Sequence, residues 1–217
     1  MIRKVIGIYF SPAGGTAIMT RRLTEGIAEK LRDCSPEEIR VEYHDLSAAE
    51  EAPSFDEETI AVAGMPVYVG KLPLPAVKAM RLIDGCGAQA VLAASYGGRS
   101  YGNALYELQR TVEDQCFRVI GAGAFLMSYR AIRGSQRSAA PAMDIKALSD
   151  YTNAAAAKIM RLHGCEVEGL KIKPAPVEVN GRMPVHKISR ISPKAAAAAE
   201  KLLEKISMRH HRSEWFL

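Results

Sequence analysis

Alternation of short apolar runs with amphipathic segments is the feature that most constrains the fold of this 217-residue chain. The apolar runs have the length and composition of buried strands, and the segments between them carry apolar residues at helical spacing. The strand-type runs are 3–10, 39–44, 59–66, 88–94 and 117–126. The helical segments are 16–32, a stretch opened by Pro73 and Pro75 that ends near 83, 104–114, and 143–163. Alternation of this kind predicts a three-layer, doubly wound α/β domain around a five-stranded parallel sheet.

The pattern changes after 163, which predicts a sheet domain at 1–163 and a small C-terminal extension at 164–217. In the extension, Asn180-Gly181 is typical of a hairpin turn between strands at 171–179 and 182–188. An alanine-rich helix is expected at 194–207. We expect the extension to pack on the sheet domain or on another subunit, with Trp215 as an anchor or part of an unstructured terminus.

Composition excludes several classes of protein. No apolar run approaches the roughly 20 residues of a membrane helix, and the chain enters a strand without a signal sequence, so we expect a cytoplasmic protein without membrane association. The net charge is +5, but no nucleic-acid motif accompanies it, and we expect no nucleic-acid partner. The widely spaced cysteines predict reduced thiols rather than a metal or iron–sulfur site; they are Cys34, Cys86, Cys116 and Cys165.

The first expected strand leads into a loop of small and hydroxylated residues before the first helix. This loop is Ser11-Pro12-Ala13-Gly14-Gly15-Thr16. The helix start leaves backbone N–H groups free for an anion, and the glycines let a phosphate approach the backbone. Because the loop lacks both the Walker lysine and the Gly-x-Gly-x-x-Gly pattern, it favours a terminal phosphate monoester held by neutral donors. The alternative is a plain turn whose glycines serve only the backbone.

Two further loops follow the third and fourth expected strands and are rich in tyrosine and glycine. The candidate residues in them are Pro66, Val67, Tyr68, Val69 and Gly70, then Ser95, Tyr96, Gly97, Gly98, Tyr101, Gly102 and Asn103. In the strand order 2-1-3-4-5, the order reverses between the first and third strands, where all three loops converge. A phosphate seat facing aromatic side chains predicts a flat, phosphorylated heterocycle as ligand. Alternatively, these loops are ordinary connections whose tyrosines pack on the surface.

All three loops resemble those of a known family, the third through its Tyr96-Gly97 and Tyr101-Gly102-Asn103 pattern. The 11–16 loop resembles the Ser/Thr-x-(T/G)-x-(N/G)-Thr phosphate loop of flavodoxins. The 64–70 run resembles the Gly-x-Pro-x-Tyr loop of flavodoxin-like proteins associated with ferredoxins in anaerobic bacteria. The resemblance covers about 1–163 and implies the flavodoxin-like strand order and non-covalent FMN. It places 11–16 on the phosphate, 67–70 beside one face and edge of the isoalloxazine, and 95–103 beside the other.

The resemblance implies an FMN-dependent electron-transfer protein or a small flavin reductase. No Ser–His–Asp or Cys–His set suggests itself, so we expect neither catalytic side chains nor a metal, with the redox chemistry carried by the flavin. An acidic ferredoxin would suit the positive net charge, and a homodimer remains open. The alternatives are an NAD(P)H-dependent quinone or nitro reductase on the same fold and a flavin-free regulatory or scaffold module.

Overall fold

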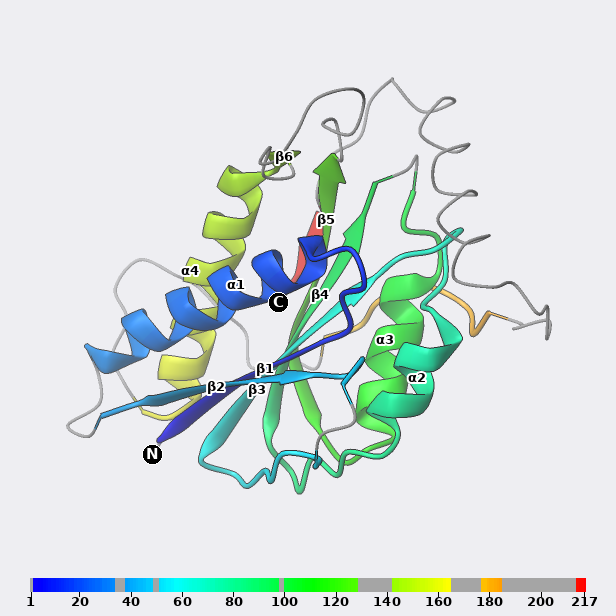
Figure 1. Cartoon of the computed structure of the whole chain (residues 1–217). Coiled ribbons are helices and arrows are strands. Elements are labelled where there is room, and N and C mark those ends of the chain that lie inside the picture. Colours follow the sequence, from blue (N-terminus) through cyan, green and yellow to red (C-terminus); the bar gives the residue numbers. More distant parts are fainter. Residues whose placement is uncertain are drawn as a thin grey trace.

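A mixed sheet covered by helices on both faces forms the centre of the structure, a computed structural model (Figure 1). It describes residues 2–33, 38–48, 51–97, 100–128, 142–164, 177–184 and 214–217. The strands are β1 (Lys4–Tyr9), β2 (Arg40–Asp45), β3 (Thr59–Pro66), β4 (Gln89–Tyr96), β5 (Arg118–Ser128), β6 (Ala142–Met143) and β7 (Glu214–Phe216). The helices are α1 (Gly15–Arg32), α2 (Leu74–Met80), α3 (Ala104–Glu113) and α4 (Ile145–Leu162).

The strand order β2-β1-β3-β4-β5 is parallel throughout and confirms the predicted 2-1-3-4-5 arrangement. β3 and β4 are buried along their whole length, which explains their continuous apolar sequence. β2 lies at one edge, and its side chains are more exposed. At the other edge, β6 and β7 pair antiparallel with β5. The strand order therefore reverses between β1 and β3, inside the parallel sheet and next to its β2 edge.

Each face of the sheet has its own apolar core. α1 and α4 cover one face, and α2 and α3 cover the other (Figure 1). α1 lies very close to β3, since a Cβ built on Gly64 would stand 1.7 Å from the Thr20 hydroxyl oxygen. This close approach sets the start of α1 beside the carboxyl ends of β1 and β3. In the described ranges, no helix combines the length and apolar character needed to cross a bilayer.

The described parts of the C-terminal extension pack on the sheet domain. The expected hairpin is wrong for 177–184, which contains no strand. Its backbone bonds instead to α3, where the Gln109 amide donates to the Val177 carbonyl at 2.5 Å and accepts from the Val179 N–H at 3.1 Å. The remainder of the expected hairpin and the whole 194–207 helix lie outside the described residues. Trp215 lies in β7, where it pairs with Gly123 of β5 and its ring centroid is 6.1 Å from that of Tyr151.

Candidate functional site

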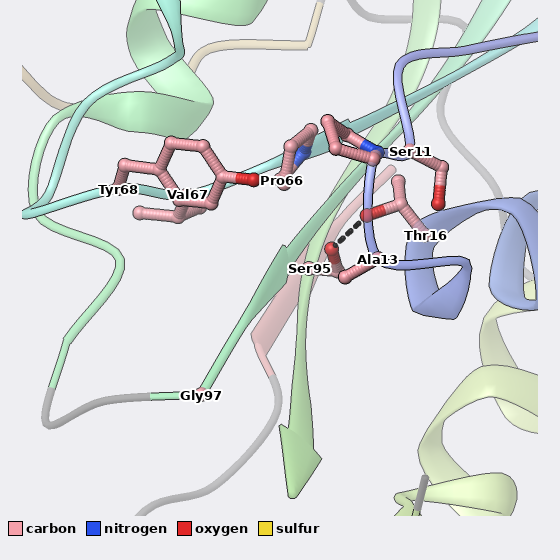
Figure 2. Close-up of a pocket in the computed structure, with 9 residues that line it drawn as sticks. Ser11, Ala13, Thr16, Pro66, Val67, Tyr68, Ser95 and Gly97 are labelled. Carbon is pink, nitrogen blue, oxygen red and sulfur yellow. Dashed lines mark hydrogen bonds between the residues drawn. The ribbon is translucent and has the colours of Figure 1, made fainter. Parts of the chain in front are cut away.

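A pocket opens at the carboxyl ends of β1, β3 and β4 (Figure 2). The residues that line it are Ser11, Pro12, Ala13, Thr16, Pro66, Val67, Tyr68, Ser95 and Gly97. All of them belong to the three loops singled out by sequence. The loops meet because the sheet reverses its strand order at this point, as expected for an open parallel sheet.

The first loop presents the start of α1 to the pocket. The Gly14 N–H donates to the Ser11 carbonyl at 3.1 Å, and Gly14 adopts φ 83°, the left-handed region that glycine tolerates. The Ser11 hydroxyl accepts from the Ala17 N–H at 2.9 Å and so caps one amide. Within the described residues, the N–H groups of Gly15 and Thr16 have no acceptor. Two amide donors at a helix N-terminus therefore remain for an anion.

A buried pair of hydroxyls joins the first loop to the third. Thr16 Oγ1 and Ser95 Oγ are 2.7 Å apart, and both residues are almost fully buried (Figure 2). One hydroxyl hydrogen is consumed by this bond, whichever oxygen donates it. The other hydroxyl hydrogen of the pair therefore remains available to a ligand. Both residues line the pocket, close to the Gly15 and Thr16 amides at the start of α1.

The second loop is a tight turn from Tyr68 to Lys71. The Tyr68 N–H donates to the Lys71 carbonyl at 2.8 Å, and the Lys71 N–H donates back at 3.2 Å. Val69 and Gly70 have φ of 53° and 73°, which gives the type I′ geometry. Such a conformation is strained for a β-branched residue, and the Val69 side chain is 72% exposed. Strain of this kind is concentrated at binding sites, and Val69 directly follows Tyr68, which lines the pocket.

The second and third loops are fixed to each other by contact between two glycines. The Asn103 N–H donates to the Gly70 carbonyl at 2.9 Å. Gly102, at φ 55°, lies so close that a Cβ there would be 2.7 Å from Gly70 Cα. The buried Glu107 carboxylate adds a second tie by accepting from the Leu72 N–H at 2.9 Å. Sequence reasoning missed Glu107, although a carboxylate on the apolar stripe of the 104–114 helix was a usable signal.

The three candidate tyrosines have different surroundings. The ring of Tyr68 lines the pocket and extends toward Pro66 and the first loop (Figure 2). Tyr96 is buried edge-on against Tyr101, with ring centroids 5.7 Å apart, and burial raises its pKa to about 12. The Tyr101 hydroxyl donates to the Glu214 carboxylate of β7 at 2.6 Å. Burial and this bond raise the pKa of Tyr101, so both phenols stay neutral in physiological conditions.

The remaining candidate residues support the pocket without lining it. They are Gly14, Gly15, Val69, Gly70, Gly102 and Asn103, whereas Gly98 lies outside the described residues. The lining residues carry no charged side chain. The pocket can therefore bind an anion through backbone amides and hydroxyls and pack a ring against Tyr68, but the lining offers no carboxylate, imidazole or amine for acid–base catalysis.

Comparison with known proteins identifies the fold. No protein-family model matches the sequence, and no curated protein matches it either. Among solved structures, a flavodoxin from the domain Archaea superposes with a TM-score of 0.51 at 18% identity, covering 72% of this chain and 98% of that one. An oxidoreductase from Corynebacterium diphtheriae superposes with a TM-score of 0.52 at 12% identity, covering 74% of this chain and 96% of that one. The sheet order, the helical layers and these superpositions agree that this chain has a flavodoxin-like fold.

Proposed function

We propose that the protein binds FMN non-covalently in this pocket and serves as an electron-transfer flavoprotein. One observation carries the proposal: α1 begins with the unpaired amides of Gly15 and Thr16, and Thr16 lines the same pocket as Tyr68. This arrangement offers a phosphate seat and an aromatic wall within a single cleft. Sequence resemblance to flavodoxins and the flavodoxin-like fold support the same ligand class.

Each loop has a separate task in this proposal. The 11–16 loop holds the phosphate through the amides of Gly15 and Thr16 and the hydroxyl donor shared by Thr16 and Ser95. Tyr68 packs against the ring, and the central peptide between Val69 and Gly70, at the tip of the turn, is placed to hydrogen-bond the ring edge. Loop 95–103 borders the other side. FMN, when bound, supplies the one- and two-electron redox chemistry, while the protein orients it and limits its contact with water.

The partner we propose is an acidic redox protein such as a ferredoxin, in the cytoplasm. The net charge of +5 favours encounter with an acidic surface by electrostatic steering. Reduction of the flavoprotein by ferredoxin rather than directly by NADPH would support an electron-carrier role. Rapid NADPH oxidation with a quinone or nitro compound would instead identify a reductase.

Titration of the apo-protein with flavins tests the ligand directly. We expect FMN to bind with loss of its fluorescence at micromolar concentration. Riboflavin, which lacks the phosphate, should bind roughly 100-fold more weakly, since it forgoes several charge-assisted hydrogen bonds. Unquenched fluorescence with both ligands would contradict the flavin proposal and favour a flavin-free scaffold.

Thr16→Val tests the hydroxyl donor next to the phosphate seat. The substitution keeps the shape of the side chain but removes one oxygen of the Thr16–Ser95 pair. We expect FMN affinity to fall about tenfold, equivalent to one hydrogen bond to a charged group. Isothermal titration calorimetry measures this change, with Thr16→Ser as the matched control that retains the hydroxyl. Riboflavin affinity should be the same in both variants, and an equal loss for riboflavin would show that the hydroxyl does not serve the phosphate.

A further inference from the structure

Two exposed cysteines lie at the end of the sheet opposite the pocket. Cys86 is in the turn between α2 and β4, and Cys116 is in the turn between α3 and β5. Both turns lead into the amino ends of parallel strands, whereas the pocket is formed at the carboxyl ends. The two turns lie at the same end of the molecule in Figure 1. The pair is therefore separated from the proposed flavin site by the length of β4.

The turn around Cys86 holds that residue in a conformation that L side chains rarely adopt. Cys86 and Gly87 have φ of 46° and 82°, and the Ala88 N–H donates to the Gly85 carbonyl at 2.8 Å. These values describe a type I′ turn, whose central positions favour Gly, Asn and Asp. The Asp84 carboxylate holds the turn by accepting from the Cys86 N–H at 2.9 Å.

Cys116 occupies a similar left-handed position at the end of α3, with φ 62°. The Phe117 N–H donates to the Val112 carbonyl at 3.4 Å, and the Cys116 N–H donates to the Glu113 carbonyl at 3.0 Å. This is the Schellman arrangement, in which the left-handed residue is normally glycine. Both turns thus carry a cysteine where backbone geometry alone would favour another residue.

Two backbone hydrogen bonds hold these turns side by side. The Gly85 N–H donates to the Gln115 carbonyl at 2.7 Å, and the Gly87 N–H donates to the Cys116 carbonyl at 2.9 Å. In a trans peptide, the N–H points to the same side as the preceding Cα, so Cys86 Cα lies beside this second bond. Standard bond lengths then keep the Cα atoms of Cys86 and Cys116 within about 6 Å of each other, a separation that a disulfide, with Cα atoms roughly 4.4–6.8 Å apart, can span.

Acidic groups surround the Cys86 thiol. Partial desolvation raises the pKa of the Cys86 thiol, and the neighbouring acidic groups of Asp84, Cys116 and Asp56 add to the shift. Both cysteine side chains are exposed, so a reagent can reach them from solvent.

We propose that Cys86 and Cys116 are a redox modification site that closes to an intramolecular disulfide on exposure to a low-molecular-weight disulfide. One cysteine thiolate attacks a reagent sulfur, forming a mixed disulfide and releasing one reagent thiolate. The second cysteine thiolate then attacks the sulfur of the first cysteine and releases the other reagent thiolate. The two protein thiols lose two electrons to the reagent, and their protons pass to the two released thiolates.

The test uses the full chain with Cys34→Ser and Cys165→Ser, so that only the proposed pair remains. After treatment with oxidised glutathione, intact-protein mass should fall by two hydrogens with no glutathione attached, and peptide mapping should link Cys86 to Cys116. The closed loop contains β4 and α3, so the oxidised protein should melt roughly 5–10 °C higher than the reduced protein. FMN affinity should stay within about twofold, because the pocket lies at the other end of the sheet.

Single variants provide the matched controls. Cys86→Ser and Cys116→Ser, each made in the same background, should take up one glutathione and keep it, because the resolving thiol is gone. Stable glutathione adducts, covalent dimers or unreacted thiols in the chain that retains both cysteines would overturn the proposal. These results are independent of flavin binding, so failure here is distinguishable from failure of the proposed function.

Discussion

Replacing Ala13 by glutamate is expected to weaken FMN binding about 100-fold. Ala13 lines the pocket and is exposed, so a longer side chain fits without disturbing the core. A carboxylate there would lie a few ångströms from a phosphate dianion bound to the Gly15 and Thr16 amides. Repulsion at about 5 Å and an intermediate dielectric amounts to roughly 3 kcal/mol, which corresponds to that loss of affinity. Fluorescence titration with FMN measures it.

Ala13→Gln is the matched control, because it has nearly the same volume without the charge. Its FMN affinity should stay within a few-fold of the parent protein. Riboflavin should bind both variants equally, since it carries no phosphate, and added salt should narrow the difference for FMN. Equal FMN affinities for the Glu and Gln variants would show that the phosphate is held elsewhere or that the ligand is not anionic.

Gly64→Ala is expected to lower the free energy of unfolding by about 3 kcal/mol, the largest stability effect we predict. The new methyl group would stand 1.7 Å from Thr20 Oγ1 and 3.0 Å from Thr20 Cβ, so α1 has to move away from β3. Thr20 is fully buried and its hydroxyl donates to the Thr16 carbonyl at 2.8 Å, which limits its freedom to rotate. Urea unfolding followed by circular dichroism measures the loss.

A double-mutant cycle with Thr20→Ala provides the control. The single variant Thr20→Ala should be mildly destabilised, by about 1 kcal/mol, since it loses one buried hydrogen bond. The double variant should be more stable than Gly64→Ala alone, because the clashing Oγ1 is absent. If it is no more stable, the helix and strand are not in direct contact at this position. FMN affinity should fall in Gly64→Ala as well, because α1 carries the Gly15 and Thr16 amides that we propose bind the phosphate.

Local sequence was sufficient to predict the five parallel strands and the loops that form the pocket. The runs 59–66 and 88–94 are apolar throughout because both faces of β3 and β4 are covered, and this produces a strong signal. The strand order was also predicted, because it is the order that the resemblance to flavodoxins implies, and the observed strand pairing agrees with it. The hairpin expected around Asn180 was wrong in its described part, because Gln109 on a distant helix satisfies the backbone there.

Sequence by itself determined which segments would form the five parallel strands, which turns would gather at one end of the sheet, and that the first of them suits a phosphate. Tertiary structure alone decided which side chains face the pocket. Ser95 completes the wall by pairing with Thr16, 79 residues away, and Glu107 fixes Leu72 across 35 residues. It also placed Tyr68 in the pocket while Tyr96 packs in the core. Strand and turn propensities act over a few neighbouring residues, whereas side-chain direction follows from contacts between segments far apart in the chain.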